Sequence, residues 1–167
     1  MSRMQGGYAE MDNWRLKYER LITPVFRTYW RFSRSATLGV RGVATNEAGH
    51  VMLVKHTYLR GWHLPGGGVE RGETAPYAIS REMEEEAGVQ PIDTPTIFAL
   101  YSNHSNFAGD HIALFRVGAW KPCQWRAGQE IAARGFFDPA NPPEGTTPAT
   151  LRRLAEVFKG APVSATW

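Results

Sequence analysis

The feature that most restricts the fold of this chain is a glycine-rich stretch that leads directly into a short acidic segment, between Gly67 and Val89. Four of the five residues from Glu82 to Glu86 are glutamates. On a helix, Glu82, Glu85 and Glu86 would project from one face, because residues three and four apart are neighbours there. Like charges at this spacing oppose helix formation by about 0.2–0.5 kcal/mol per pair. A divalent cation with oxygen ligands would offset that repulsion, so the pattern predicts a metal site.

The same segment carries start and stop signals of a helix. Thr74 is placed to cap its first turn, and Pro76 suits a position where a missing N–H costs little. Gly88 stands where a left-handed residue commonly ends a helix. An apolar stripe repeats every four residues beside the acidic face: Ile79, Met83 and Ala87. We expect the stripe to pack on a core and the acidic face to be exposed, so that Glu86→Gln would leave folding intact.

This stretch resembles the Nudix box, the signature of the Nudix hydrolase family. The box reads Gly, five residues, Glu, seven residues, Arg-Glu, an apolar residue, any residue, Glu-Glu, any residue, Gly and an apolar residue. Every position is matched, by Gly67, Glu73, Arg81, Glu82, Met83, Glu85, Glu86, Gly88 and Val89. A chance match in a chain of this length is on the order of 10⁻⁸ from average residue usage. The motif covers 23 of 167 residues, and the resemblance implies an α+β fold, the Nudix-type α/β/α sandwich with a mixed β-sheet.

The resemblance also implies which residues hold the metal. Glu85 and Glu86 are expected to be the main ligands, and Glu82 a third ligand or the general base. The backbone carbonyl of Gly66 is expected to join them. The expected ion is Mg²⁺, with Mn²⁺ as an alternative, because clustered carboxylates beside a glycine loop suit a hard cation that works on a phosphate.

Three further charged residues are predicted to support this site. By resemblance, Glu73 and Arg81 pair and brace the loop on the helix, a role that orients the ligands, and we count both among the residues needed for catalysis. Some family members carry another acidic ligand or base shortly before the closing aromatic strand. Glu130 has about that placement before Phe136-Phe137. A surface loop glutamate is an equal interpretation of Glu130.

Candidates for substrate contact lie on both sides of the box: Arg60, Trp62, Gly67 and His111. Arg60 would hold a phosphate and Trp62 would stack on a base, although core packing is the stronger interpretation of Trp62. At Gly67 the backbone can approach a phosphate closely. His111 begins a predicted strand that faces the site in related folds, and it can equally fill a half-buried structural position.

Composition limits the class of protein. The chain has 167 residues, of which 43% are hydrophobic and 21% charged, which suits one globular domain. Its single cysteine, Cys123, excludes an internal disulfide and suits a reducing compartment. No signal peptide and no apolar run of about 20 residues is found. We therefore expect a cytoplasmic protein that binds a small nucleotide and neither membrane nor nucleic acid.

The chain divides at about residue 34. Residues 1–34 are predicted to form a helical arm, part of the same unit as a Nudix hydrolase domain at 35–167. Residues 1–35 hold seven Lys or Arg and three Asp or Glu, a difference of +4, whereas the whole chain carries +3. The arm is interpreted as packing on the domain or on a second subunit of a homodimer; arginines that border substrate phosphates, or a peripheral membrane contact, are weaker alternatives.

Within the domain, residues 36–45 and 51–56 are predicted to form a hairpin across a turn at 46–49. Further strands are expected at 62–64, 96–102, 111–117 and 130–137. The last helix is predicted at 147–159, with inward side chains at Leu151, Leu154, Val157 and Phe158.

The leading hypothesis is metal-dependent hydrolysis of a phosphoanhydride bond in a nucleoside diphosphate linked to another moiety: a nucleotide, a nucleotide sugar or a nucleoside triphosphate. Carboxylates and metal ions suffice for this chemistry without a protein nucleophile. The alternative is a non-catalytic Nudix domain that senses a nucleotide. A third hypothesis makes the basic aromatic arm an interaction module. Sequence motifs for particular substrates are not satisfied, so the substrate stays open.

Overall fold

The computed structural model describes residues 36–125 and 130–167, and the predicted helical arm at 1–34 lies outside the described residues. By their contacts, Ala36–Trp167 form one unit. Its elements, in chain order, are β1 (Thr37–Val43), β2 (Val51–His56), α2 (Ala75–Glu82), the π-helical turn η1 (Met83–Ala87), β3 (Val89–Pro91), β4 (Thr96–Ser102), β5 (Asp110–Arg116), β6 (Trp120–Pro122), β7 (Ile131–Phe137) and α3 (Pro148–Lys159).

The largest sheet has the order β1-β5-β4 and is mixed, as predicted. β1 runs parallel to β5, with Val40 opposite Ala113, and β4 runs antiparallel to β5. The glycine loop pairs with the other edge of β1. There the N–H of Val40 donates to the carbonyl of Gly67 at 2.8 Å, and the N–H of Gly42 donates to the carbonyl of Pro65 at 2.9 Å. The sheet thus positions the glycine loop directly.

The predicted hairpin of residues 36–45 and 51–56 is present beside its turn and is wrong along β1. The turn exists, since the N–H of Gly49 donates to the carbonyl of Asn46 at 2.9 Å. Next to the turn, Thr45 bridges Val51, and the N–H of Met52 donates to the carbonyl of Ala44 at 3.0 Å. Ala44 and Thr45 follow β1, however, and among the described residues none of β1 itself pairs with β2. Both edges of β1 are already taken, by β5 and by the glycine loop, so β2 pairs antiparallel with β7 instead, with Val51 opposite Phe137. β3 and β6 form a third, two-stranded sheet.

The helix of the acidic segment begins and ends where the sequence predicts. The hydroxyl of Thr74 accepts the N–H of Tyr77 at 3.4 Å, and Pro76 lies in the first turn. Gly88 ends the helix in the left-handed conformation, with φ of 63°. The last turn, Met83–Ala87, is a π-helix, which the residue spacing did not predict. None of the described helices has the length and apolarity of a membrane span.

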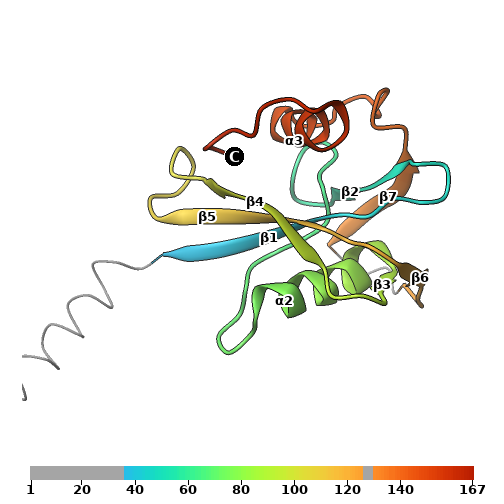
Figure 1. Ribbon diagram of the computed structural model, residues 1–167, viewed down its shortest axis with the longest axis horizontal. Helices are drawn as coiled ribbons and strands as arrows, with labels where there is room; N and C mark the ends of the chain where they lie inside the picture. Colours follow the sequence, from blue (N-terminus) through green and yellow to red (C-terminus); the bar gives the residue numbers. More distant parts are fainter. Residues whose placement is uncertain (1–35, 126–129) are drawn as a thin grey trace, which may run out of the picture. The chain divides into compact units, whose positions relative to one another are not determined.

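Two cores lie on opposite sides of the strands, one under α2 and one under α3 (Figure 1). The predicted stripe of Ile79, Met83 and Ala87 is fully buried in the first core. Gly42 of β1 allows that approach, because a Cβ atom there would lie 2.6 Å from the sulfur of Met83. This layering confirms the predicted α/β/α sandwich.

Helix α3 covers the second core with a slightly different face from the predicted one. Leu154 is buried, but Leu151 is 43% exposed. The inward positions include Arg153 and Glu156. They form a buried ion pair, in which a guanidinium nitrogen of Arg153 lies 2.7 Å from Oε1 of Glu156. The hydroxyl of Tyr101 on β4 donates to Glu156 at 2.7 Å, so the pair attaches α3 to the sheet.

Candidate metal and phosphate site

Glu86 is the point where the acidic helix meets the glycine loop. It is 8% exposed, so the prediction of an exposed carboxylate is wrong for this residue. The N–H of Gly66 donates to its Oε2 at 2.8 Å, and Nδ1 of His56 lies 3.7 Å from its Oε1. Burial raises the pKa of Glu86 to about 7, against the lowering effects of Gly66 and Arg41. A cation at this carboxylate would favour its ionised form.

Glu82 and Glu85 face Arg81. One guanidinium nitrogen of Arg81 lies 2.8 Å from Glu82 Oε1 and 3.2 Å from Glu85 Oε2. Of these two glutamates, Glu85 is exposed and Glu82 is half-buried. Burial raises the pKa of Glu82. Gly67 lies against Glu82, since a Cβ atom there would be 2.4 Å from Oε1. Two glutamates therefore share one arginine at the mouth of the glycine loop.

The predicted brace between Glu73 and Arg81 is present in the structure. Nε of Arg81 donates to Oε1 of Glu73 at 3.0 Å, and a second guanidinium nitrogen donates to Oε2 at 3.2 Å. Oε2 of Glu73 also accepts the N–H of Glu70 at 3.0 Å. The hydrogen bond from Arg81 is the main cause that lowers the pKa of Glu73. This two-pronged pair joins the loop to the helix.

Glu73→Gln is expected to lower kcat by about 10-fold, because second-layer partners of metal ligands typically contribute that much. The melting temperature should also fall, modestly, because the pair is bidentate and its two side chains are only 22% and 12% exposed. Steady-state kinetics and thermal unfolding measure the two effects. Glu70→Gln, an exposed residue of the same loop, is the matched control and should behave as wild type. Unchanged kcat in Glu73→Gln would contradict the proposed bracing role.

Arg41 of β1 is a site residue that the sequence reasoning missed. Its guanidinium donates to the carbonyl of Gly66 and, at 3.5 Å, to that of Leu64. Its charge acts on both Glu86 and Glu82, while burial lowers its own pKa. The signal in the sequence was a single charged residue inside an otherwise apolar strand, Thr37–Val43. Arg41 thus ties the glycine loop to the sheet, and it contacts the carbonyl predicted to bind metal.

The remaining candidates lie around this centre. Glu130 is exposed, and its charge contributes, after burial and Glu82, to the raised pKa of Glu86. Trp62 packs edge-on against Phe137, with ring centroids 4.8 Å apart, which agrees with the core interpretation. Arg60 is exposed, and its backbone carbonyl lies 3.0 Å from Nε2 of His63. The structure does not bring these side chains to the helix glutamates through any direct contact among the described residues.

His111 is the second residue of β5 and is half-buried. Its Nδ1 lies 3.2 Å from the carbonyl of Gly109, and it is the register partner of Leu38 and Ser102. These contacts fit a residue that holds the end of the strand. A contact between His111 and a substrate stays a prediction.

The donor atoms of the site suit magnesium by their chemistry. Glu82, Glu85, Glu86 and the Gly66 carbonyl offer oxygen alone, which is what Mg²⁺ prefers. In the part of the chain that the structure describes, no three His, Cys, Asp or Glu side chains are already gathered for a metal ion. Arg41 and Arg81 make contacts with these oxygens instead. Within the described ranges, each of Glu82 and Glu85 accepts from Arg81 through one oxygen, so the second oxygen of each carboxylate is left for an ion.

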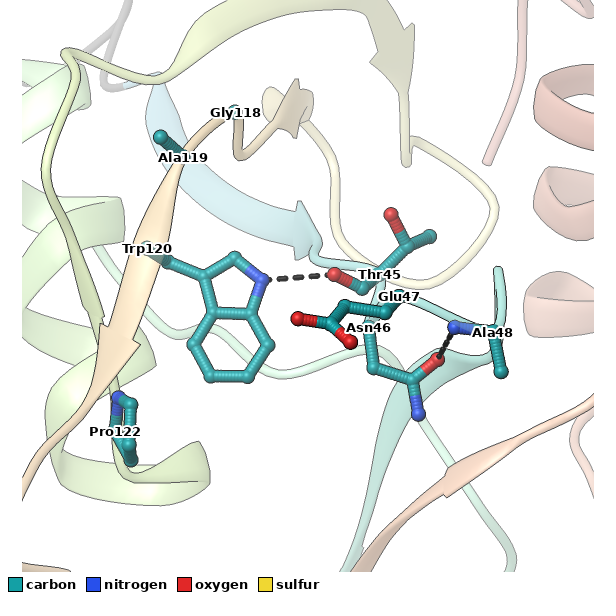
Figure 2. A pocket seen from close by; sticks show the side chains of 8 residues that line it. All are labelled: Thr45, Asn46, Glu47, Ala48, Gly118, Ala119, Trp120 and Pro122. Carbon is teal, nitrogen blue, oxygen red and sulfur yellow. Dashed lines mark hydrogen bonds between the residues drawn. The ribbon is translucent and has the colours of Figure 1, made fainter.

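A separate open hollow of about 740 Å³ lies between the turn after β1 and the β6 strand. Figure 2 shows the indole of Trp120 among the lining side chains, with its ring N–H donating to the carbonyl of Thr45 at 2.8 Å. The indole also stacks on Phe136, with ring planes 17° apart. Among the residues that line the hollow, Glu47 is the one with a carboxylate. None of the box glutamates lines this hollow, so it is distinct from the metal site.

Comparison with known proteins gives the following relatives. A family model described as the NUDIX domain matches residues 36–156. The chain is similar to an RNA pyrophosphohydrolase from Aeromonas hydrophila subsp. hydrophila, with 41% identity over 61 residues, 36% of this chain and 34% of that protein. A second RNA pyrophosphohydrolase, from Hydrogenovibrio crunogenus, is 37% identical over 51 residues, 30% of this chain and 31% of that protein. The chain thus matches about a third of the length of these relatives.

Solved structures support the same fold. A MutT NUDIX hydrolase from Burkholderia pseudomallei superposes with a TM-score of 0.63 and 23% identity, over 74% of this chain and 99% of that chain. At this identity the likeness is one of fold alone. The family model, in contrast, covers more than half of the chain and includes the whole box from Gly67 to Val89. The chain therefore belongs to the Nudix hydrolase family.

Proposed function

We propose that the protein hydrolyses a phosphoanhydride bond in a nucleoside diphosphate linked to another moiety, with Mg²⁺, or alternatively Mn²⁺, as the cofactor. One observation carries this proposal: Glu86 of the acidic helix accepts the backbone N–H of Gly66 at 2.8 Å. The complete box therefore forms one site, with helix carboxylates and glycine-loop backbone in contact. Phosphoryl-type transfer needs mainly such positioning and charge neutralisation.

Each charged residue then has a distinct role. Glu85 and Glu86 are the proposed main ligands of the metal ion, with Glu82 as a third ligand or the general base; when bound, the ion supplies a polarised phosphoryl oxygen and an activated water. Burial raises the pKa of Glu82 above its ordinary value, which is the direction that suits a general base. Because Glu86 is committed to the N–H of Gly66, Glu82 is the proposed base for the attacking water. Arg81 aligns Glu82 and Glu85.

The substrate is proposed at the level of a class. Arg60 and Tyr58 are exposed near the site end of β2 and are candidates to contact the non-reacting part of the nucleotide. Although the sequence led us to expect no nucleic acid, the similarity to proteins named RNA pyrophosphohydrolase adds a second candidate substrate. That candidate is the triphosphorylated 5′ end of an RNA, which contains the same phosphoanhydride linkage.

A substrate panel with Mg²⁺ tests the proposal. The panel contains nucleoside triphosphates, a dinucleoside polyphosphate, nucleotide sugars, ADP-ribose and 5′-triphosphorylated RNA, and the released phosphate, pyrophosphate or nucleoside monophosphate is identified for each. We expect turnover of at least one member that requires the metal and stops with a chelator. Tight binding of one member without turnover of any would instead support a nucleotide-sensing domain.

A further inference from the structure

His56, the last residue of β2, is a buried polar side chain with no role in the site described so far. It is 4% exposed, and neither ring nitrogen has a hydrogen-bond partner among the described residues. Buried polar atoms almost always have a partner, and an unpaired one costs about 1–3 kcal/mol. A histidine held in this way indicates a partner that it meets in the working state of the protein.

Two rings lie against His56, and one carboxylate oxygen lies near its Nδ1. The ring of Tyr58 lies 5.3 Å from the imidazole, centroid to centroid, and the ring of His63 lies at 5.6 Å and nearly perpendicular. The pairing of β2 with β7 shifts register between Lys55 and His56, and such bulges re-aim a side chain. The polar atom that Nδ1 faces is Oε1 of Glu86, at 3.7 Å.

The two oxygens of Glu86 therefore have different polar neighbours. Oε2 accepts the N–H of Gly66 at 2.8 Å, whereas Oε1 stands just beyond hydrogen-bond reach of His56. Ordinary N–H···O separations are about 2.7–3.2 Å, so a carboxylate movement of less than about 1 Å completes the second bond. A neutral imidazole has one N–H to donate. Burial, together with the nearby Arg41 and His63, lowers the pKa of His56 and so disfavours a charged ring.

We propose that His56 is a positioning residue that fixes the carboxylate plane of Glu86 by donating from Nδ1 to Oε1, so that Glu86 presents a defined oxygen to the metal. Partners of this kind typically contribute about 10- to 100-fold to metal affinity. The inference rests on the proposed function, because it takes Glu86 as a metal ligand. It adds a residue that lies outside the box and that the motif does not predict.

The test uses two variants of matched shape. His56→Asn keeps an N–H donor close to the position of Nδ1, and His56→Leu has nearly the same shape without a donor. Mn²⁺ affinity of the full chain is measured without substrate, by the electron paramagnetic resonance signal of free Mn²⁺. We expect His56→Leu to weaken binding by about 10-fold or more and His56→Asn to stay within about threefold of wild type. Thermal unfolding of both variants records any change in packing.

Glu86→Gln in the same titration distinguishes the role of His56 from the assignment of Glu86 as a metal ligand. If Glu86→Gln weakens Mn²⁺ binding but His56→Leu binds as wild type does, the role of His56 is overturned and the proposed function stands. Equal weakening by His56→Leu and His56→Asn also overturns it, because packing and not the donor would then matter. If Glu86→Gln binds Mn²⁺ as wild type does, the ligand assignment and the role of His56 both fail. In the Glu86→Gln background, His56→Leu should have no further effect.

Discussion

Replacing Glu86 by Gln is expected to lower kcat by about 10³-fold or more, which corresponds to about 4 kcal/mol of transition-state stabilisation. The amide oxygen of Gln can still accept the N–H of Gly66, which is 2.8 Å from the carboxylate in the wild type. It brings no negative charge to the metal, however, and charge neutralisation is the main work of this kind of site. Initial rates at saturating substrate, with Mg²⁺ varied, measure the effect.

The same variant should fold as well as wild type, for a different reason from the one the sequence suggests. Glu86 is buried, and Arg41, Glu82, Glu130 and His56 all act on or face its carboxylate. Burial raises its pKa from 4.5 to about 7, so in metal-free protein the ionised carboxylate is less favourable folded than unfolded. Its contribution to stability therefore falls as pH rises from about 4.5 to about 7. Measured in chelator at pH 8, Glu86→Gln should melt at the same or a higher temperature than wild type.

Glu84→Gln is the matched control for this experiment. Glu84 belongs to the same π-helical turn and is half-buried, but it is not a position of the box. Burial and, after it, the charge of Glu84 raise the pKa of Cys123, which follows β6. The main charges that act on the pKa of Glu86 are instead those of Arg41, Glu82 and Glu130. We expect kcat of Glu84→Gln within about twofold of wild type. Similar losses in both variants would mean that the net charge of the helix, and not the position of Glu86, supports activity.

Local sequence predicted those parts of the site that local chemistry determines. Thr74 and Gly88 cap the helix because a hydroxyl oxygen and a left-handed glycine satisfy backbone groups within a few residues. Glu73 and Arg81 pair because one turn of loop and two turns of helix bring them together. The homodimer, the cytoplasmic location and the role of the N-terminal arm stay predictions.

Positions set by the sheets and by the last helical turn could not be predicted in the same way. The expectation that Glu82, Glu85 and Glu86 share one exposed face assumed α-helical spacing. In the structure the turn Met83–Ala87 is π-helical; Glu85 points outward to Arg81, and Glu86 is buried beneath the glycine loop. Arg41 and His56 reach the site from β1 and β2, whose pairing depends on strands far along the chain. Sequence spacing carries no information on those contacts.

The three consecutive glycines of the loop are expected to differ sharply in their tolerance of alanine, with Gly66→Ala the most damaging. Gly66 has φ of +142°, and a Cβ atom there would lie 2.0 Å from the carbonyl oxygen of Val40. The backbone of β1 cannot move aside, because it is hydrogen-bonded to the loop itself. We expect a loss of about 3 kcal/mol or more in the free energy of unfolding, and a melting temperature lower by about 6–12 °C.

Gly67→Ala should separate activity from folding. The backbone at Gly67 does not have a positive φ, so an alanine is not strained there. Its Cβ atom would lie 2.4 Å from Oε1 of Glu82, which is the end of a flexible side chain. The carboxylate can therefore turn away, and we expect the free energy of unfolding to change by no more than about 1 kcal/mol. Because Glu82 is then displaced from the site, kcat should fall by about 10- to 100-fold.

Gly68→Ala is the control within the same run of residues, since a Cβ atom there meets nothing within 4 Å and the backbone has no positive φ. It should match wild type in both kcat and thermal unfolding. The series therefore isolates three physical effects at neighbouring positions: backbone conformation at Gly66, contact with a carboxylate at Gly67, and neither at Gly68. Equal damage from all three substitutions would show that the loop needs flexibility as a whole, and would contradict the close fit of Gly66 to β1 and of Gly67 to Glu82.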